Sequence, residues 1–252
     1  MNILILNASP KSKGSASAFY SSLLRLFLTR CEVKVNPLRG ARDYEKTFAL
    51  LPWADAVLIS APVYVDAAPS HVTAFLEQAE QLCQEQLCHF KLYAISNCGF
   101  IEGHQNELHL RIYEAWCQRA DVCWGGGLGI GGVILRWMCM LTALFTVLDT
   151  VRLILTAQAA SLTVRMIFSC YSSMLVTLVM SLGTVSCLVI MGHRIKHGAC
   201  HKNLFTRCLM PSFLFIPVSD IFMLLSALAH GNLPYTLFRR RECPAQEKGT
   251  HL

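Results

Sequence analysis

The chain has 252 residues, of which 54% are hydrophobic and only 15% are charged, and its formal net charge is +6. Average soluble domains contain roughly 25% charged residues, so this composition disfavours a chain that is water-exposed throughout. Its basic residues are not interleaved with aromatic residues as in an RNA-binding protein, and we expect no nucleic-acid partner.

The charges divide the chain into two parts. Residues 1–130 carry 11 Lys and Arg against 12 Asp and Glu, whereas residues 131–252 carry 11 against 4. A basic excess beside apolar segments favours anionic lipid as a partner. We therefore predict a globular domain at 1–132 and an apolar helical region, associated with a membrane, at 133–252.

The 12 cysteines do not form a metal-binding pattern. No CxxC occurs, and the closest pairs are Cys83/Cys88 and Cys117/Cys123, which lack zinc or iron–sulfur spacing. No signal peptide precedes the first predicted strand, so we expect a reducing cytosolic environment, free thiols and no metal.

The first stretch of the chain combines a strand, a small-residue loop and the start of a helix. Ile3 to Asn7 are mostly apolar with no polar face, which is typical of a parallel strand covered on both sides. A run rich in serine follows, and then a helix over 18–29. Free backbone N–H groups and the helix dipole make such a turn an anion site. An ordinary turn with serine caps is the alternative.

Strands and helices continue to alternate through the first half. Further strands are expected at 32–36, 54–61, 90–96 and from 122, with helices at 44–53, 70–86 and 104–119. This alternation predicts a doubly wound, five-stranded parallel sheet of the α/β class. The loops 8–17, 61–69 and 97–103 follow strands, and open α/β sheets bind ligands at that edge.

Three segments in these loops resemble one family. Ser9-Pro10-Lys11 with Gly14-Ser15 is similar to the phosphate loop of the flavodoxin-like NAD(P)H-dependent FMN reductases. Ser60 to Tyr64 is similar to their SPVY segment, and Asn97 to Phe100 to their third flavin loop. The resemblance covers about residues 2–130 and implies a flavodoxin-like fold.

The resemblance implies FMN as the cofactor and NAD(P)H as the co-substrate. The cofactor carries the hydride chemistry, so we assign no catalytic side chain. We interpret Cys98 as a small loop residue, and His104 and His109 as surface or capping residues. The cofactor-binding residues expected are Ser9, Lys11, Ser15, Ser17, Pro62, Val63, Tyr64, Val65, Asn97, Cys98 and Gly99.

Three positions depart from the family pattern. Ala8 stands where the family usually has glycine, Ala16 where threonine is common, and Val65 where an aromatic residue is frequent. The first two changes concern the phosphate loop, and the third removes an aromatic wall from the flavin site.

The second half contains candidate membrane segments. Met166 to Gly192 is a run of 27 residues without a charge, long enough to cross a bilayer. Residues 134–157 form a second candidate, which we also expect to cover the last strand, and residues 209–229 a third, interfacial one. We predict a hairpin of 134–157 and 166–191, with the basic residues after it on the cytoplasmic side. A soluble homodimer with these helices at its interface is the alternative.

We therefore expect a membrane-associated FMN-dependent NAD(P)H oxidoreductase with its flavin domain in the cytoplasm. It would pass hydride from the nicotinamide to the flavin and on to an acceptor such as a quinone or a free flavin. A non-catalytic, membrane-anchored flavodoxin-like module for binding or electron transfer is the alternative.

Overall fold

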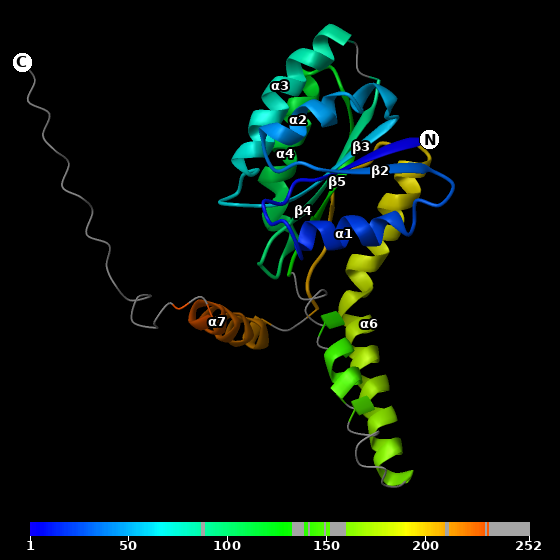
Figure 1. Ribbon diagram of the computed structural model, residues 1–252, viewed down its shortest axis with the longest axis vertical. Coiled ribbons are helices and arrows are strands. Elements are labelled where there is room, and N and C mark those ends of the chain that lie inside the picture. Colours follow the sequence, from blue (N-terminus) through cyan, green and yellow to red (C-terminus); the bar gives the residue numbers. More distant parts are fainter. Residues whose placement is uncertain are drawn as a thin grey trace, which may run out of the picture. The chain divides into compact units, whose positions relative to one another are not determined.

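The computed structural model describes residues 1–86, 89–132, 139–140, 142–148, 150–151, 160–209, 212–229 and 231. The chain divides into two compact units, Met1–Leu209 and Met210–Leu252. The first unit contains a parallel sheet with helices on both faces (Figure 1). In the second, helix α7 (Ser212–Ala229) contains Pro217 and occupies the range expected for the third apolar segment.

The elements of the first half lie close to their predicted ranges. The strands are β1 (Asn2–Asn7), β2 (Glu32–Pro37), β3 (Ala56–Pro62), β4 (Lys91–Asn97) and β5 (Cys123–Ile130). The helices are α1 (Ala16–Arg25), α2 (Ala41–Phe48), α3 (Ser70–Gln86) and α4 (Glu107–Arg119). Two short 3-10 turns, η1 (Leu51–Trp53) and η2 (Gly103–Asn106), precede β3 and α4.

The sheet has the order β2-β1-β3-β4-β5-β6, and neighbouring strands are parallel. The prediction of a parallel α/β sheet is confirmed, but the predicted number of strands is wrong. The sixth strand, β6 (Leu204–Phe205), pairs with Leu128 and Gly129 of β5. Two residues are too few to show a hydrophobic period, so only the pairing with β5 defines this strand.

The sheet carries a separate apolar layer on each face. Helices α2, α3 and α4 cover one face with residues such as Phe75, Leu76 and Trp116. Helix α1 and the end of α6 (Ala160–Lys196) cover the other face with Tyr20, Leu24, Leu188, Met191 and Ile195. Burial on both faces explains why β1, β3 and β4 are apolar without alternation.

The last turns of α6 belong to the core of the sheet. Leu188, Met191 and Ile195 are fully buried at helical spacing. A Cβ on Gly192 would come within 2.9 Å of Phe27 Cβ, so glycine permits a close approach to the chain after α1. Both α6 and β6 follow residue 132, so the sheet continues past the predicted domain boundary.

The expectation that residues 134–157 cover the last strand is wrong in the described part of that segment. Residues 139–140, 142–148 and 150–151 are helical, and the side chains of 143–148 are exposed. Residues 133–138, 141, 149 and 152–159 lie outside the described part. Thr142 and Thr177 join this helical segment to α6 through their hydroxyls, 3.0 Å apart.

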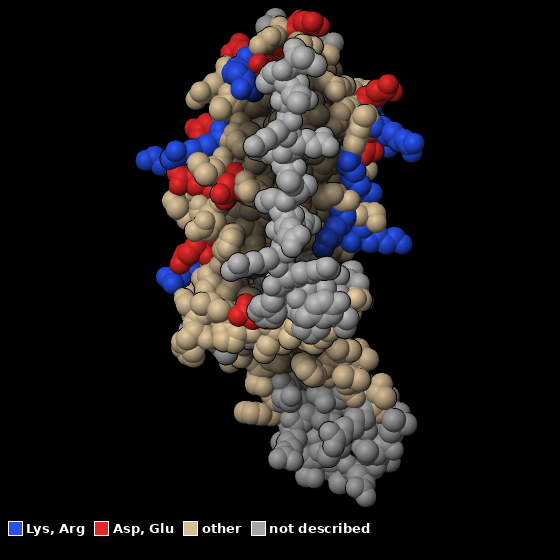
Figure 2. Space-filling model, turned by 90° about the vertical axis from the view of Figure 1, so that its left-hand side faces the viewer, with Lys and Arg blue, Asp and Glu red and all other residues tan. Residues whose placement is uncertain are grey.

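The first part of α6 presents apolar side chains to its surroundings. Phe168, Tyr171, Met174, Leu175 and Leu178 are all exposed. By length and composition, Tyr171–Lys196 is a helix in the described part of the chain that could cross a membrane. Figure 2 shows blue and red side chains distributed over the α/β part of the molecule.

Replacing Leu188 with alanine tests the role of α6 in the core. Leu188 is fully buried, and Ile190 on the same helix is 41% exposed. We expect Leu188→Ala to lower the free energy of unfolding by about 2–5 kcal/mol, because it leaves a cavity against the sheet. Ile190→Ala should cost roughly 1 kcal/mol or less. Urea unfolding in detergent, followed by tryptophan fluorescence, measures both; equal losses would contradict this packing.

Candidate functional site

Backbone hydrogen bonds join the carboxyl ends of neighbouring strands. The three predicted loops therefore meet at one edge of the sheet, as open α/β sheets require for a ligand site. The bonds run from Ala8 N–H to Ser60 O (2.9 Å), from Val63 N–H to Asn97 O (3.1 Å) and from Cys98 N–H to Ile130 O (3.0 Å).

Buried side chains fix the start of α1 against two strands. The hydroxyl of Ser17 donates to Asn97 Oδ1 at 2.8 Å, and the hydroxyl of Ser60 donates to the Ser17 carbonyl at 2.9 Å. All three side chains are buried. The Ser17 proton is therefore used inside the protein, so Ser17 positions the helix start rather than donating from the loop.

The loop before α1 has the donors of an anion site. Ser15 is the N-cap and accepts a bond from Ala18 N–H at 3.1 Å. Gly14 has a φ of +64°, a conformation that favours glycine. Among the described residues, none accepts a hydrogen bond from the backbone N–H groups of residues 12–17. Such unpaired donors at a helix N-terminus, together with the helix dipole, attract an anion.

Three cations lie in or beside this loop: Lys11 and the likewise exposed Lys13 within it, and Arg39 beside it. Lys11 is exposed, as expected of a lysine in such a turn. Arg39, which sequence reasoning missed, donates from Nη2 to the Ser12 carbonyl at 3.0 Å. Arg39 follows the carboxyl end of β2, so its place at this edge was readable from the strand order alone. It adds positive charge to the outer side of the loop.

The second loop exposes apolar side chains at a tight turn. Tyr64 and Ala67 exchange two backbone hydrogen bonds of 3.0 Å, and the intervening Val65 and Asp66 have φ values of +48° and +60°. This is the pattern of a type I′ turn, which valine rarely adopts. Tyr64 is 47% exposed and Val65 is 99% exposed. Pro62 and Val63 beneath them are half-buried.

The third loop mixes buried and open positions. Asn97 and Cys98 are buried, whereas Phe100 is 63% exposed. A Cβ on Gly99 would meet no atom within 4 Å, so the backbone there is open to approach. Burial raises the pKa of the Cys98 thiol, although Asn106 Nδ2 lies 3.3 Å from its sulfur. A neutral, buried thiol fits a loop residue and not a nucleophile.

A buried polar network lies under this loop. Ser96 Oγ is 2.7 Å from both Asn106 Oδ1 and His109 Nδ1, and His109 Nε2 is 2.9 Å from Tyr113 OH. Asn106 Oδ1 needs a donor, so Ser96 donates to it, His109 donates from Nδ1 to Ser96, and Tyr113 donates to His109 Nε2. The interpretation of His109 as a surface or capping residue is wrong, because its side chain is fully buried.

The segment after β6 forms backbone hydrogen bonds to the third loop. Gly103 N–H donates to Thr206 O at 2.7 Å, and Cys208 N–H donates to Ile101 O at 3.0 Å. A Cβ on Gly103 would come within 2.4 Å of Thr206 O, which requires glycine there. These residues are about a hundred positions apart in the sequence, so no local pattern could reveal the contact.

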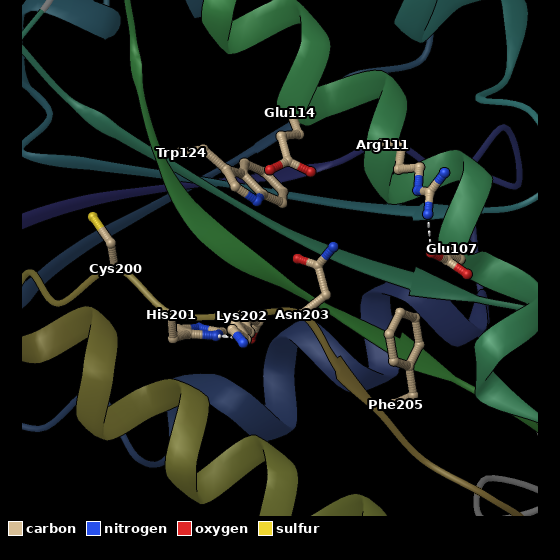
Figure 3. A pocket seen from close by; sticks show the side chains of 9 residues that line it. All are labelled: Glu107, Arg111, Glu114, Trp124, Cys200, His201, Lys202, Asn203 and Phe205. Atoms are coloured by element: carbon tan, nitrogen blue, oxygen red, sulfur yellow. Dashed lines mark hydrogen bonds and ion pairs between the residues drawn. The ribbon is translucent and has the colours of Figure 1, made fainter.

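A separate cavity of about 600 Å³ lies between α4 and the segment at 200–205 (Figure 3). None of the expected flavin-binding residues lines it. Its walls are mixed in charge and contain two aromatic rings. They consist of Glu107, Arg111, Glu114, Trp124, Cys200, His201, Lys202, Asn203 and Phe205.

Comparison with known proteins gave matches among solved structures alone: no family model and no curated protein matches the chain. The Trp repressor binding protein of Bacillus subtilis is 12% identical, with a TM-score of 0.42 over 50% of this chain and 85% of that chain. An NADPH-quinone reductase from P. pentosaceus is 18% identical, with a TM-score of 0.43 over 50% and 83%. An azoreductase from Bacillus anthracis is 10% identical, with a TM-score of 0.43 over 52% and 86%.

The buried His109 makes stability depend on pH. Burial lowers its pKa from 6.5 to about 4, so the unfolded chain takes up a proton before the folded chain does. Its contribution is fully present above pH 6.5 and is lost as the pH falls towards 4, by an amount on the order of 3 kcal/mol. We expect the free energy of unfolding of His109→Gln, measured with urea, to change less steeply with pH between 4 and 6.5 than that of the natural chain. An unchanged slope in His109→Gln would contradict this role of the buried imidazole.

Proposed function

We propose that the chain is an FMN-dependent NAD(P)H oxidoreductase whose flavin domain lies at the cytoplasmic face of a membrane. The observation that carries the proposal is the meeting of two features at one sheet edge. Unpaired backbone N–H groups lie at the start of α1, and exposed apolar side chains lie on the two neighbouring loops. A phosphate at one end and a flat apolar ring at the other would need this combination.

The phosphate would bind at residues 9–17. Backbone N–H groups and the α1 dipole supply the attraction, and Ser9 and Ser15 add hydroxyl oxygens beside them. Lys11 and Arg39 contribute positive charge from the outer side. Ala8 stands where the FMN reductases usually have glycine. Its side chain is fully buried and its N–H donates to the Ser60 carbonyl, so alanine also keeps this strand end in place.

The ring would bind against residues 62–65 and 97–99. Tyr64 and Val65 offer exposed apolar surface, and the open backbone at Gly99 permits a close approach. A bound flavin supplies the hydride chemistry, so the protein needs to leave one face of the ring accessible. Because Val65 is not aromatic, the face of the flavin ring next to it would be less enclosed. An electron acceptor could then enter and leave on that face.

The membrane half of the proposal rests on α6 and its neighbour. Residues 168–182 contain no charged residue, and their apolar side chains are largely exposed. The hydroxyl contact of Thr142 with Thr177 places the preceding helical segment beside α6. Arg194, Lys196 and Lys202 follow the apolar run, which favours a cytoplasmic position for that end. A quinone or another apolar acceptor would then reach the flavin from the lipid side.

A non-catalytic electron carrier or binding module remains the second candidate. The specific observation in its favour is Ser17, whose hydroxyl is bonded to Asn97 and so leaves one donor fewer for a phosphate. The absorption spectrum of protein purified in detergent separates the two candidates. A flavin band that NADH or NADPH bleaches supports the enzyme. A flavin band that neither nucleotide bleaches supports an electron carrier, and colourless protein that cannot take up FMN supports a binding module.

A carboxylate at Ser15 should expel the cofactor. Aspartate is as good an N-cap as serine, so Ser15→Asp keeps α1 capped while it adds a negative charge. Two unit charges roughly 6 Å apart at an effective dielectric constant of about 20 repel by about 3 kcal/mol, which weakens binding on the order of 100-fold. Flavin fluorescence during titration with FMN measures the dissociation constant.

Ser15→Asn is the matched control, because asparagine caps the helix without charge. It should bind FMN within a few-fold of the natural chain. Equal affinity of the aspartate and asparagine variants would show that the phosphate does not lie at α1.

A lysine on the apolar part of α6 should release the chain from membranes. Leu178 is 56% exposed, and Leu108 on α4 is similarly exposed at 54%. A lysine at the centre of a membrane helix costs roughly 3 kcal/mol, so Leu178→Lys should lower the membrane-bound fraction markedly. Carbonate extraction followed by centrifugation measures that fraction.

Leu108→Lys is the control on the α/β part, and it should stay in the membrane pellet. Extraction of the natural chain by carbonate without detergent would contradict the membrane assignment. It would favour the alternative of a soluble dimer, without affecting the flavin site.

A further inference from the structure

Two thiols from distant parts of the chain meet beside the cavity of Figure 3. Cys123 Sγ and Cys200 Sγ are 3.3 Å apart, and both residues are exposed. Cys123 begins β5, and Cys200 lies in the segment that leads from α6 to β6. The two thiols therefore lie at the two ends of a stretch of chain that contains the segment at 134–157 and α6.

Three hydrogen bonds hold the segment of Cys200 in place. Lys91 Nζ donates to the Gly198 carbonyl, Tyr93 OH donates to Ala199 O at 3.1 Å, and His201 N–H donates to Gly125 O at 3.0 Å. Gly125 lies near the start of β5, and Lys91 is the strand neighbour of Cys123. These hydrogen bonds lie on both sides of Cys200 and keep its thiol beside that of Cys123. A disulfide between them would therefore need a small movement of the side chains and no rearrangement of the backbone.

Exposure and the short distance between the two sulfurs distinguish this pair from the neighbouring Cys117. Burial and the hydrogen-bonded Cys200 raise the pKa of Cys123, and the Lys91 ammonium acts in the opposite direction. Cys117, which also lies near Cys123, is buried, and its pKa is raised to about 12, chiefly by desolvation. Exposure and a nearby cation are the conditions under which thiols react with small disulfides.

The geometry points to Cys123 and Cys200 as a redox-active pair that closes to a disulfide by exchange with a low-molecular-weight disulfide such as oxidised glutathione. The thiolate of one cysteine attacks a sulfur of the small disulfide, which forms a mixed disulfide and releases one small thiol. The second cysteine, as its thiolate, attacks the mixed disulfide and releases the other. The protein loses two protons and two electrons, and one small disulfide takes them up to become two thiols.

Closure of the pair would fix one wall of the cavity. Figure 3 shows Cys200, His201, Lys202 and Asn203 in succession along the wall opposite Glu107, Arg111 and Glu114 of α4. In the reduced protein hydrogen bonds and packing, such as the ring contact of His201 with Tyr93, hold this wall. In the oxidised protein a covalent bond ties it to β5, so access to the cavity and the attachment of α6 to the sheet would respond to the thiol redox state.

The test uses the full chain in detergent, incubated in glutathione buffers of increasing ratio of oxidised to reduced form. The protein is then alkylated and digested without reduction, and the peptides are analysed by mass spectrometry. We expect a linked peptide that contains Cys123 and Cys200, growing with the ratio and disappearing when excess reduced glutathione is added. Cys200→Ser should abolish this peptide, and Cys31→Ser, which removes a half-buried thiol elsewhere, should retain it.

Two results would overturn the pair. One is persistence of both cysteines as free thiols or glutathione adducts at the most oxidising ratio, and the other is linkage of Cys123 to Cys117. Hydrogen exchange tests the clamp separately: the amide of His201 should exchange at least about tenfold more slowly after oxidation, while amides of α3 stay unchanged. Equal exchange of His201 in both states would overturn the clamp.

Discussion

Parallel strands are buried on both faces, and each face must be covered by helices that follow from the chain connections. In this protein α1 covers part of one face, and the missing part is filled by the last turns of α6, with Leu188, Met191 and Ile195. That single packing contact determines the rest of the arrangement. The chain leaves the sheet after β5, runs through its apolar segments, and returns to complete the same core.

Because of this contact, the apolar second half of the chain is part of the globular core and not a separate anchor. A membrane anchor attached by a linker could be removed without loss to the globular domain. Here the same helix contributes exposed apolar residues at one end and core residues at the other. If the first part of α6 lies in lipid, as the proposed function has it, the α/β unit is held directly at the membrane surface, because no linker separates the two parts of the helix.

The return of the chain also reaches the candidate site. After α6 the chain forms β6, and residues 206–208 then bond to the loop at 101–103. Beneath that loop, hydrogen bonds link Ser96, Asn106, His109 and Tyr113, and Asn106 Nδ2 also donates to the carbonyls of residues 103 and 130. A fully satisfied buried network makes a loop rigid, whereas a broken one is costly in a low-dielectric interior. The third loop of the site is therefore held from below by α4 and from outside by the second half of the chain.

The sequence by itself determined the order of strands and helices in the first half, because buried parallel strands are continuous apolar runs and each is separated by an amphipathic helix. It also placed the three loops at one edge, since carboxyl ends of parallel strands share an edge. It could not show β6, the bracing by residues 206–208, the burial of His109 or the meeting of Cys123 with Cys200. Apart from the burial of His109, which depends on how α4 packs on the sheet, these features depend on pairing between residues tens of positions apart, which leaves no local period. The tertiary structure alone decided that α6 covers the sheet and that the described residues between 139 and 151 do not, because both segments are apolar and only packing against Leu24 and the strands distinguishes them.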